Sequence, residues 1–353
     1  MPFHTRILSR LLCIAALLLP AIARAQTEAV FDVGRYAFEN GGEIASMKVG
    51  YVTWGKLNGT KDNAILLVPG TSGSRHSYDA YIGPGKAYDT DKYFVIGADP
   101  IGGGTSSQPK DGLGTRFPDY TIRDMVRVQH EFVTRGLGLA RLLAVGGSSM
   151  GSFQGVEWGI NFPDFMRGLI LIVPAARSDN HFGTIFDAFY ATITLDPNYQ
   201  GGAYATNPTE GIRRAALIYF PWTSSDEYLA TLSPAALAQA QKEAGDAWVQ
   251  NWDANSMLSR YRASRMHDAS KPFGDDMMKA LGQVKAKALL LPSMTDRTVP
   301  GYLTRELYKG LHDATYAEIP TIRGHSGGGL PQGTAEYAYI IERVRAFLDQ
   351  LHG

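Results

Sequence analysis

Short apolar runs that alternate with helix-like stretches constrain the fold of this 353-residue chain more than any other feature. The runs are residues 64–68, 93–96, 142–145, 169–173, 288–291 and 316–319. Each is continuously apolar, which is typical of strands buried on both faces of a mostly parallel sheet. Residues 47–54 instead alternate, as a half-exposed antiparallel edge strand does. The pattern predicts an α/β fold with a mostly parallel central sheet flanked by helices.

The strand rhythm stops between residues 177 and 286, where helix-forming residues, aromatic residues and methionine are frequent. Prolines interrupt this segment at Pro197, Pro208, Pro221 and Pro234. Because proline breaks helices, we expect several short helices here. The segment is therefore predicted to be a helical cap or lid, inserted into a core made of residues 26–176 and 287–353. Apolar residues at helical spacing after Tyr337 predict a C-terminal helix.

The first 25 residues have the pattern of a secretory signal peptide. Arg6 and Arg10 precede an apolar run at 11–19, and Ala23-Arg24-Ala25 precedes Gln26. The run is too short to span a bilayer. We expect cleavage near Ala25/Gln26 and an exported protein, periplasmic or secreted, without stable membrane insertion.

Charge and cysteine content exclude several classes of function. With Arg6, Arg10 and Arg24 removed, the 34 Lys+Arg become 31 against 34 Asp+Glu, so the mature net charge is about −3. This balance disfavours nucleic acid and anionic membranes as partners. The single cysteine, Cys13, lies in the signal segment, and we find no His/Asp/Glu cluster at ligand spacing. We expect no metal and no cofactor.

A candidate nucleophile follows the third apolar run. Gly147-Ser148-Ser149-Met150-Gly151 joins that predicted strand to a predicted helix, which is the context in which G-x-S-x-G forms a nucleophile elbow. Ser149 has glycine two positions before and two after it, whereas Ser148 is followed two positions later by Met150. The frame predicts Ser149 as the nucleophile of an α/β-hydrolase fold. The alternative is an ordinary glycine-rich turn.

A serine nucleophile needs a histidine base and a carboxylate, which follow it in the order Ser, Asp or Glu, His in this fold. His325 lies in a glycine-rich loop after the last run, and Asp296 lies in the loop after 288–291. The other histidines after Ser149 lie in the predicted cap, in a polar turn or at the terminus, and they are His181, His267, His312 and His352. We predict that His325 is the base and Asp296 the acid. The alternative for Asp296 is a surface ion pair with Arg297.

Backbone N–H groups must stabilise the oxyanion in such a mechanism. The fold uses the residue after the nucleophile, Met150, and a residue of the loop after an early strand, which here is Thr71. A phosphate loop at 70–74 or 102–104 is the competing interpretation. Neither segment has the Gly-Lys-Ser/Thr ending of such a loop.

Further stretches resemble the homoserine O-acetyltransferase family, a branch of the α/β-hydrolases. They are residues 51–58, 62–66, 83–85, 89–96, 117–118, 121–126, 149–151 and 253–256. The resemblance runs from about residue 31 to the end of the chain and is weaker in the cap. It implies that Ser149 is acylated in a ping-pong mechanism, that Asp296 and His325 complete a catalytic triad, and that the cap builds the acceptor pocket. A homodimer is compatible with it.

Three departures from the family pattern point away from acetyl transfer to homoserine. Ser326 follows the histidine where homoserine-binding members have Asp, and Ala216 and Thr223 stand where they have an Arg and a Tyr for the substrate carboxylate. An exported enzyme also would not meet acyl-CoA, so water becomes the expected acceptor. We therefore expect an exported serine hydrolase that cleaves a carboxylic ester or a related small-molecule acyl substrate.

Two other functions stay open. One is an O-acyltransferase of the homoserine O-acetyltransferase type, and the other is a non-catalytic ligand-binding member of the fold. Aromatic residues of the cap are expected to line an apolar pocket or to pack the cap, and they are Phe182, Phe186, Phe189, Tyr190, Tyr199, Tyr204, Tyr219, Phe220 and Trp222.

Overall fold

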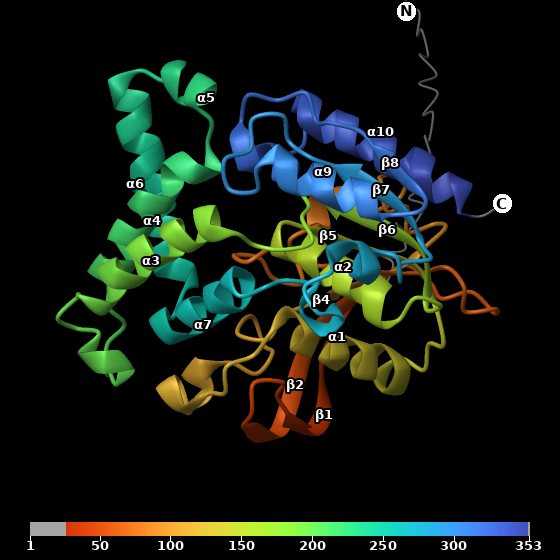
Figure 1. Ribbon diagram of the computed structural model, residues 1–353, viewed down its shortest axis with the longest axis horizontal. Coiled ribbons are helices and arrows are strands. Elements are labelled where there is room, and N and C mark those ends of the chain that lie inside the picture. The colour runs from red at the N-terminus through yellow and green to blue at the C-terminus, as the bar shows by residue number, and fades with distance from the viewer. Residues whose placement is uncertain (1–25, 352–353) are drawn as a thin grey trace, which may run out of the picture.

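The computed structural model describes residues 26–351, drawn in colour in Figure 1. The predicted signal segment, with Cys13, and His352 lie outside the described residues. Within the described residues, no helix combines the length and apolar character that crossing a membrane requires.

The core is one eight-stranded sheet with the strand order β1-β2-β4-β3-β5-β6-β7-β8. β1 pairs antiparallel with β2, and β2 antiparallel with β4, whereas the pairs from β4 to β8 are parallel. The strands are β1 Thr27–Ala37, β2 Glu43–Trp54, β3 Ala64–Val68, β4 Phe94–Ala98, β5 Leu142–Ser148, β6 Met166–Ile172, β7 Lys287–Leu291 and β8 Ala314–Tyr316. The predicted α/β fold with a mostly parallel sheet is confirmed.

Two predictions about the edges of the sheet were wrong. The sequence analysis placed an edge strand at residues 47–54, but β2, which contains them, lies between β1 and β4. The edge strand is β1, which was not predicted because most of its residues are exposed and its register with β2 shifts twice, so it lacks a clear apolar pattern. The last strand ends at Tyr316, whereas the sequence placed it at 316–319. The regular pairing of β8 with β7 ends at Tyr316. Ala317 and Ile319 still donate backbone hydrogen bonds to Leu290 and Pro292, but these bonds lie beyond the paired strand.

The α-helices of the described residues are α1 Ile122–Glu131, α2 Met150–Asn161, α3 Asn180–Thr194, α4 Thr209–Thr223, α5 Asp226–Ala230, α6 Pro234–Asn251, α7 Ala254–Arg265, α8 Met277–Leu281, α9 Gly301–Gly310 and α10 Ala335–Gln350. Some of them cover the two faces of the sheet. Alternate residues of the buried strand β3 point to opposite faces, so Leu66 belongs to the apolar cluster on the face covered by α1, α2 and α9, and Leu67 to the cluster on the face covered by α10. This explains why the strand is apolar at every position.

Helices α3 to α7 gather on one side of the sheet (Figure 1). Helices α3, α4, α6 and α7 share an apolar core of their own, formed mainly by aromatic residues such as Phe189 and Tyr261. The following helix, α8, packs instead against α9 and the core. Helices α3 to α7 form a layer over the loops that leave the strands (Figure 1). The boundaries of core and cap drawn from the sequence stay a prediction.

Candidate active site

Ser149 lies at a sharp turn between β5 and α2. Its backbone has φ 57° and ψ −122°, a strained conformation for a residue with a side chain. A side chain at Gly147 would collide with the backbone of Gly151, and one at Gly151 would collide with the carbonyl oxygen of Val68. The two glycines of the motif are therefore required by the close approach of these backbones. The turn presents the serine hydroxyl at the carboxyl end of the sheet.

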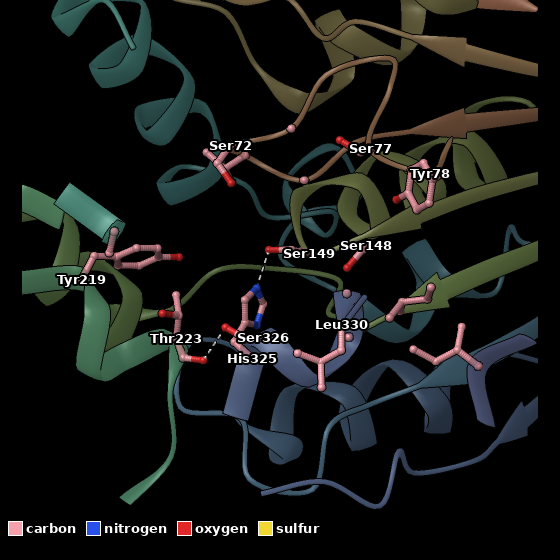
Figure 2. Close-up of a pocket in the computed structure, with 18 of the residues that line it drawn as sticks. Ser72, Ser77, Tyr78, Ser148, Ser149, Tyr219, Thr223, His325, Ser326 and Leu330 are labelled. Carbon is pink, nitrogen blue, oxygen red and sulfur yellow. Dashed lines mark hydrogen bonds between the residues drawn. The ribbon is translucent and has the colours of Figure 1, made fainter. Parts of the chain in front are cut away.

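The structure brings Ser149, His325 and Asp296 together from three separate loops. His325 Nε2 lies 2.9 Å from Ser149 Oγ, and His325 Nδ1 lies 2.6 Å from Asp296 Oδ2. Figure 2 shows the histidine ring directed at the serine hydroxyl. The arrangement is that of a nucleophile, a base and an orienting carboxylate.

The Asp296 carboxylate is fixed on its other side. Its Oδ1 accepts hydrogen bonds from the N–H groups of Thr298 and Val299, both at 2.8 Å. Its side chain is 1% exposed. Arg297, the alternative partner considered from the sequence, instead pairs with Asp226 at 2.7 Å. Asp296 is therefore free to hold His325 in one orientation.

The loop that carries His325 is held by the cap. Gly324 has φ 65°, and a side chain there would collide with the backbone of Ser224, just after α4. Ser225 Oγ donates a hydrogen bond to the carbonyl of Ile322, and Ser326 Oγ donates one to the carbonyl of Thr223 at 3.1 Å. The segment after α4 thus positions the histidine loop.

The two predicted oxyanion donors lie beside the nucleophile. Met150 is the first residue of α2, so its N–H has no acceptor within the helix. Thr71 lies in a tight turn closed by a 3.0 Å hydrogen bond from Gly73 N–H to the Gly70 carbonyl. Neither N–H donates a hydrogen bond to another group of the described chain. Both are thus available to a negatively charged oxygen near Ser149.

A buried arginine that sequence reasoning missed supports this turn. Arg260 of α7 is 3% exposed, and its Nη1 donates to the carbonyls of Thr71 at 2.7 Å and Gly73 at 3.1 Å. Its Nη2 donates to the carbonyl of Gly102 at 2.7 Å, and its guanidinium stacks on Trp252. Among the described residues no carboxylate forms an ion pair with it. The sequence carried no signal for this role, because α7 carries three arginines and their burial cannot be read from the local pattern.

The glycine-rich loop at 102–104 receives side chains of the protein itself. A side chain at Gly103 would occupy the position of the Arg260 guanidinium, and one at Gly104 would collide with the Asp99 carboxylate. The glycines at 103 and 104 are therefore explained by close contacts with side chains of the protein itself. The phosphate-loop interpretation is not supported.

A cavity of about 450 Å³ opens beside Ser149 and His325. Its residues on the cap side are Ala216, Tyr219, Phe220, Thr223, Ala244, Trp248 and Tyr261. Those on the core side include Tyr78, Tyr81, Tyr88, Ser148, Ile172, Leu330, Ile340 and Val344. Its described lining contains no Asp, Glu, Lys or Arg. The site can therefore hold an uncharged ligand without burying an unpaired charge.

A second, very small pocket of about 10 Å³ lies on another side of Ser149. It is bounded by Thr71, Ser149, Phe153, Arg177, Ser178, Phe182, Ser264, Thr298, Val299 and Leu303. Its size allows about one methyl-sized group. His325 lines the large cavity but not this pocket.

Comparison with known proteins identifies the family. Residues 63–321 match the family described as "alpha/beta hydrolase fold". The homoserine O-acetyltransferase of Methanosphaerula palustris is 31% identical, over 88% of this chain and 70% of that protein. The chain is an α/β-hydrolase of the homoserine O-acetyltransferase-like branch.

Solved structures of both activities resemble this α/β-hydrolase. An acetylester hydrolase from Corynebacterium glutamicum has a TM-score of 0.82 and 28% identity, covering 92% of this chain and 95% of that chain. A homoserine O-acetyltransferase from Bacillus anthracis has a TM-score of 0.82 and 25% identity, covering 92% of this chain and 98% of that one. The family thus supports an enzyme that transfers acyl groups, with water or another acceptor.

The positions that departed from the family pattern all line the large cavity of this α/β-hydrolase. Ala216 and Thr223 lie on its cap wall and Ser326 lies beside His325. In Figure 2 the Ser326 hydroxyl is directed toward Thr223, to whose carbonyl it is bonded. None of the three carries a charge that could form an ion pair with a charged group of a substrate.

The aromatic residues of the cap divide between the two roles expected of them. Tyr219 and Phe220 line the large cavity and Phe182 lines the small pocket. Most of the others pack inside the cap. The sequence analysis did not anticipate that tyrosines of the core would form much of the cavity, because they lie in a segment, 78–88, with little regular structure.

His181 and His267 lie outside the site and contact other groups of the protein. His181 Nε2 lies 2.6 Å from the carbonyl oxygen of Arg297. His267 is stacked on Phe153, and burial lowers its pKa to about 3. Near it, burial raises the pKa of Glu157 to about 7, although Arg123 opposes this effect. Glu157 belongs to the nucleophile helix α2, and His267 packs against that helix.

Proposed function

We propose that this α/β-hydrolase is an exported serine esterase that hydrolyses acetate-type esters of uncharged alcohols. The observation that carries the proposal is the absence of any Asp, Glu, Lys or Arg from the described lining of the large cavity. Homoserine carries an ammonium and a carboxylate at neutral pH, and burying either without a partner is costly. A neutral ester meets no such cost.

In the proposed reaction, Ser149 Oγ attacks the ester carbonyl while His325 Nε2 takes its proton. Asp296 stabilises the resulting imidazolium, and the N–H groups of Met150 and Thr71 stabilise the oxyanion. His325 then gives the proton to the leaving alcohol, which departs and leaves an acyl-Ser149 ester. Water, deprotonated by His325, hydrolyses that ester, releasing the acid and restoring the serine.

The two pockets suggest how the ester lies. The leaving alcohol oxygen must come within reach of His325, which lines only the large cavity. The alcohol therefore belongs in the large cavity and the acyl group in the small pocket. A pocket for about one methyl group favours acetate. The names of the related acetylester hydrolase and homoserine O-acetyltransferases agree with an acetyl group.

Export remains part of the proposal and rests on the sequence of the first 25 residues. Acyl-CoA is absent outside the cytoplasm, so an exported enzyme is expected to use an ester as its acyl donor and water as its acceptor. Detection of the processed chain, beginning at Gln26, in the periplasmic or culture fraction would test it. A chain that keeps Met1 and stays in the cytoplasm would refute it.

The catalytic test uses the chain from Gln26 and its Ser149→Ala variant. We expect the wild type to release p-nitrophenol from p-nitrophenyl acetate without any added acceptor, and the variant to lose at least about 1000-fold in kcat. Hydrolysis that persists in the variant would refute the role of Ser149. Failure of Ser149 to react with a fluorophosphonate would favour the non-catalytic alternative.

Acetyl transfer to homoserine is the second candidate, because relatives with that name are 31% identical. A parallel sample with acetyl-CoA and homoserine distinguishes the two. Formation of O-acetylhomoserine, with no hydrolysis of acetate esters, would replace the esterase proposal.

A further inference from the structure

The large cavity has one end on the core side of Ser149. We call this end the core chamber and define it by Tyr78, Tyr81, Tyr88, Ser148, Ile172, Leu330, Ile340 and Val344. Figure 2 shows Tyr78, Ser148 and Leu330 on one side of Ser149, with Tyr219 and Thr223 of the cap on the other. The cavity therefore extends in two directions from the reacting serine.

Most of the core chamber is formed by deeply buried side chains. Ile340 and Val344 are each 1% exposed, and Tyr88 is 2% exposed. On the cap side Tyr219 and Trp248 are only partly buried. A ligand that reaches past Ser149 on the core side therefore lies among buried side chains.

Two hydroxyl groups of the core chamber have no protein partner. No hydrogen bond joins the Tyr88 hydroxyl, or the Ser148 hydroxyl, to another group within residues 26–351. The Ser148 hydroxyl points away from that of Ser149 and toward Leu330 (Figure 2). Neither hydroxyl is among the fully buried, unpaired side-chain atoms of the described residues, so both are accessible from the cavity. Both hydroxyls line the cavity and can serve a ligand.

The remaining wall of the core chamber is hydrocarbon. Ile172, Leu330, Ile340 and Val344 supply aliphatic surface, while the hydroxyls of Tyr78 and Tyr81 donate to the carbonyls of Val68 and Leu330. Burial raises the pKa of Tyr88 well above 10, so its hydroxyl keeps its proton and can donate. The wall suits an alkyl chain that carries one uncharged oxygen.

On the basis of the proposed esterase function, we propose that the core chamber binds the far end of the alcohol part of the substrate. The structure assigns to it an aliphatic chain with a second hydroxyl at its end, hydrogen-bonded to Tyr88 and Ser148. The substrate class is therefore the monoacetate of an aliphatic diol. A plain alkyl acetate would form no hydrogen bond with either hydroxyl.

The test compares two series of acetates, one of straight-chain alcohols from ethanol to octanol and one of the diols of equal length. We expect a length at which the terminal hydroxyl raises kcat/KM about 5- to 10-fold in the wild type. Tyr88→Phe keeps the ring and removes only the hydroxyl, so this gain should fall to about 2-fold or less. Tyr308→Phe, at an exposed position of α9, is the matched control and should keep the gain.

A second variant, Val344→Phe, fills the core chamber and should shift the preferred alcohol to a shorter length, provided that its thermal unfolding shows a folded protein. A wild type with no gain at any length, or an equal gain in Tyr88→Phe, would overturn the proposal. If the wild type hydrolyses no acetate, the esterase function fails separately. The core chamber is then judged by protection: diols should slow fluorophosphonate labelling of Ser149 in the wild type, and equal protection in Tyr88→Phe would overturn it.

Discussion

Replacement of Arg260 by methionine tests whether this buried cation holds the oxyanion turn in its active position. The side chain makes hydrogen bonds of 2.7, 3.1 and 2.7 Å to the carbonyls of Thr71, Gly73 and Gly102. A hydrogen bond to a charged group contributes about 1.5–3 kcal/mol, so the variant removes roughly 4–9 kcal/mol of tethering from two loops. The variant no longer has to bury a charged guanidinium, and this offsets part of the loss in stability. The offset does not return the Thr71 N–H to its active position.

A displacement of about 1 Å in a catalytic group lowers the rate by roughly 100-fold. We therefore expect Arg260→Met to lower kcat for p-nitrophenyl acetate by about 100-fold, which corresponds to about 2.7 kcal/mol in the activation barrier. KM should change by less than about 3-fold, because the lost interaction acts mainly in the transition state. Arg260→Lys, which keeps the charge but loses the planar fork, should recover part of the rate.

The matched control is Arg262→Met, on the same helix but paired with Asp119 at the surface. It should keep wild-type kcat. Circular dichroism and thermal unfolding establish that each variant is folded. A folded Arg260→Met with kcat within about 3-fold of the wild type would refute the reasoning.

Three further changes probe the small pocket, position 326 beside the catalytic histidine, and the buried groups Glu157 and His267. Leu303→Ala enlarges the small pocket and should raise the butyrate-to-acetate ratio of kcat/KM by about 10-fold or more; an unchanged ratio would mean that the acyl group lies elsewhere. Ser326→Asp places a carboxylate beside His325 and should favour esters with an ammonium group over neutral ones, which competition between the two esters measures. Glu157, with its pKa raised from 4.5 to about 7, stabilises the fold as pH falls through that window, whereas His267, lowered from 6.5 to about 3, destabilises it. Glu157→Gln removes the stabilising effect of Glu157, so in urea unfolding its stability should fall more steeply than that of the wild type as the pH is lowered below about 7, and a parallel pH dependence would contradict this.

The sequence was most informative where chemistry or steric crowding dictates a local pattern. Buried strands such as β3 are apolar at every position, so their positions could be predicted closely. The glycines around Ser149 are imposed by close backbone approach, and the structure brings that serine to the predicted His325 and Asp296. Each of these features is visible within a few residues of the chain.

Features that depend on contacts between distant segments could not be predicted. Arg260 lies 189 positions from Thr71, and nothing near either residue announces their hydrogen bond. The core chamber combines side chains from the segment before β4, from β5 and β6, and from α10. β1 owes its place to pairing with β2 and not to burial of its own side chains. Such features follow from the fold and not from a local motif.

The contacts between the segment after α4 and the loop of His325 restrict how the cap can move. Gly324 is pressed against Ser224, and the Ile322 and Thr223 carbonyls are bonded to serines on the opposite sides of this junction. A cap that swung away as a rigid lid would break these contacts and pull the base from its serine. The enzyme would then be switched off in the same motion that uncovered it. Substrate exchange must therefore use the fixed mouth of the cavity, or else each opening is a brief period without activity.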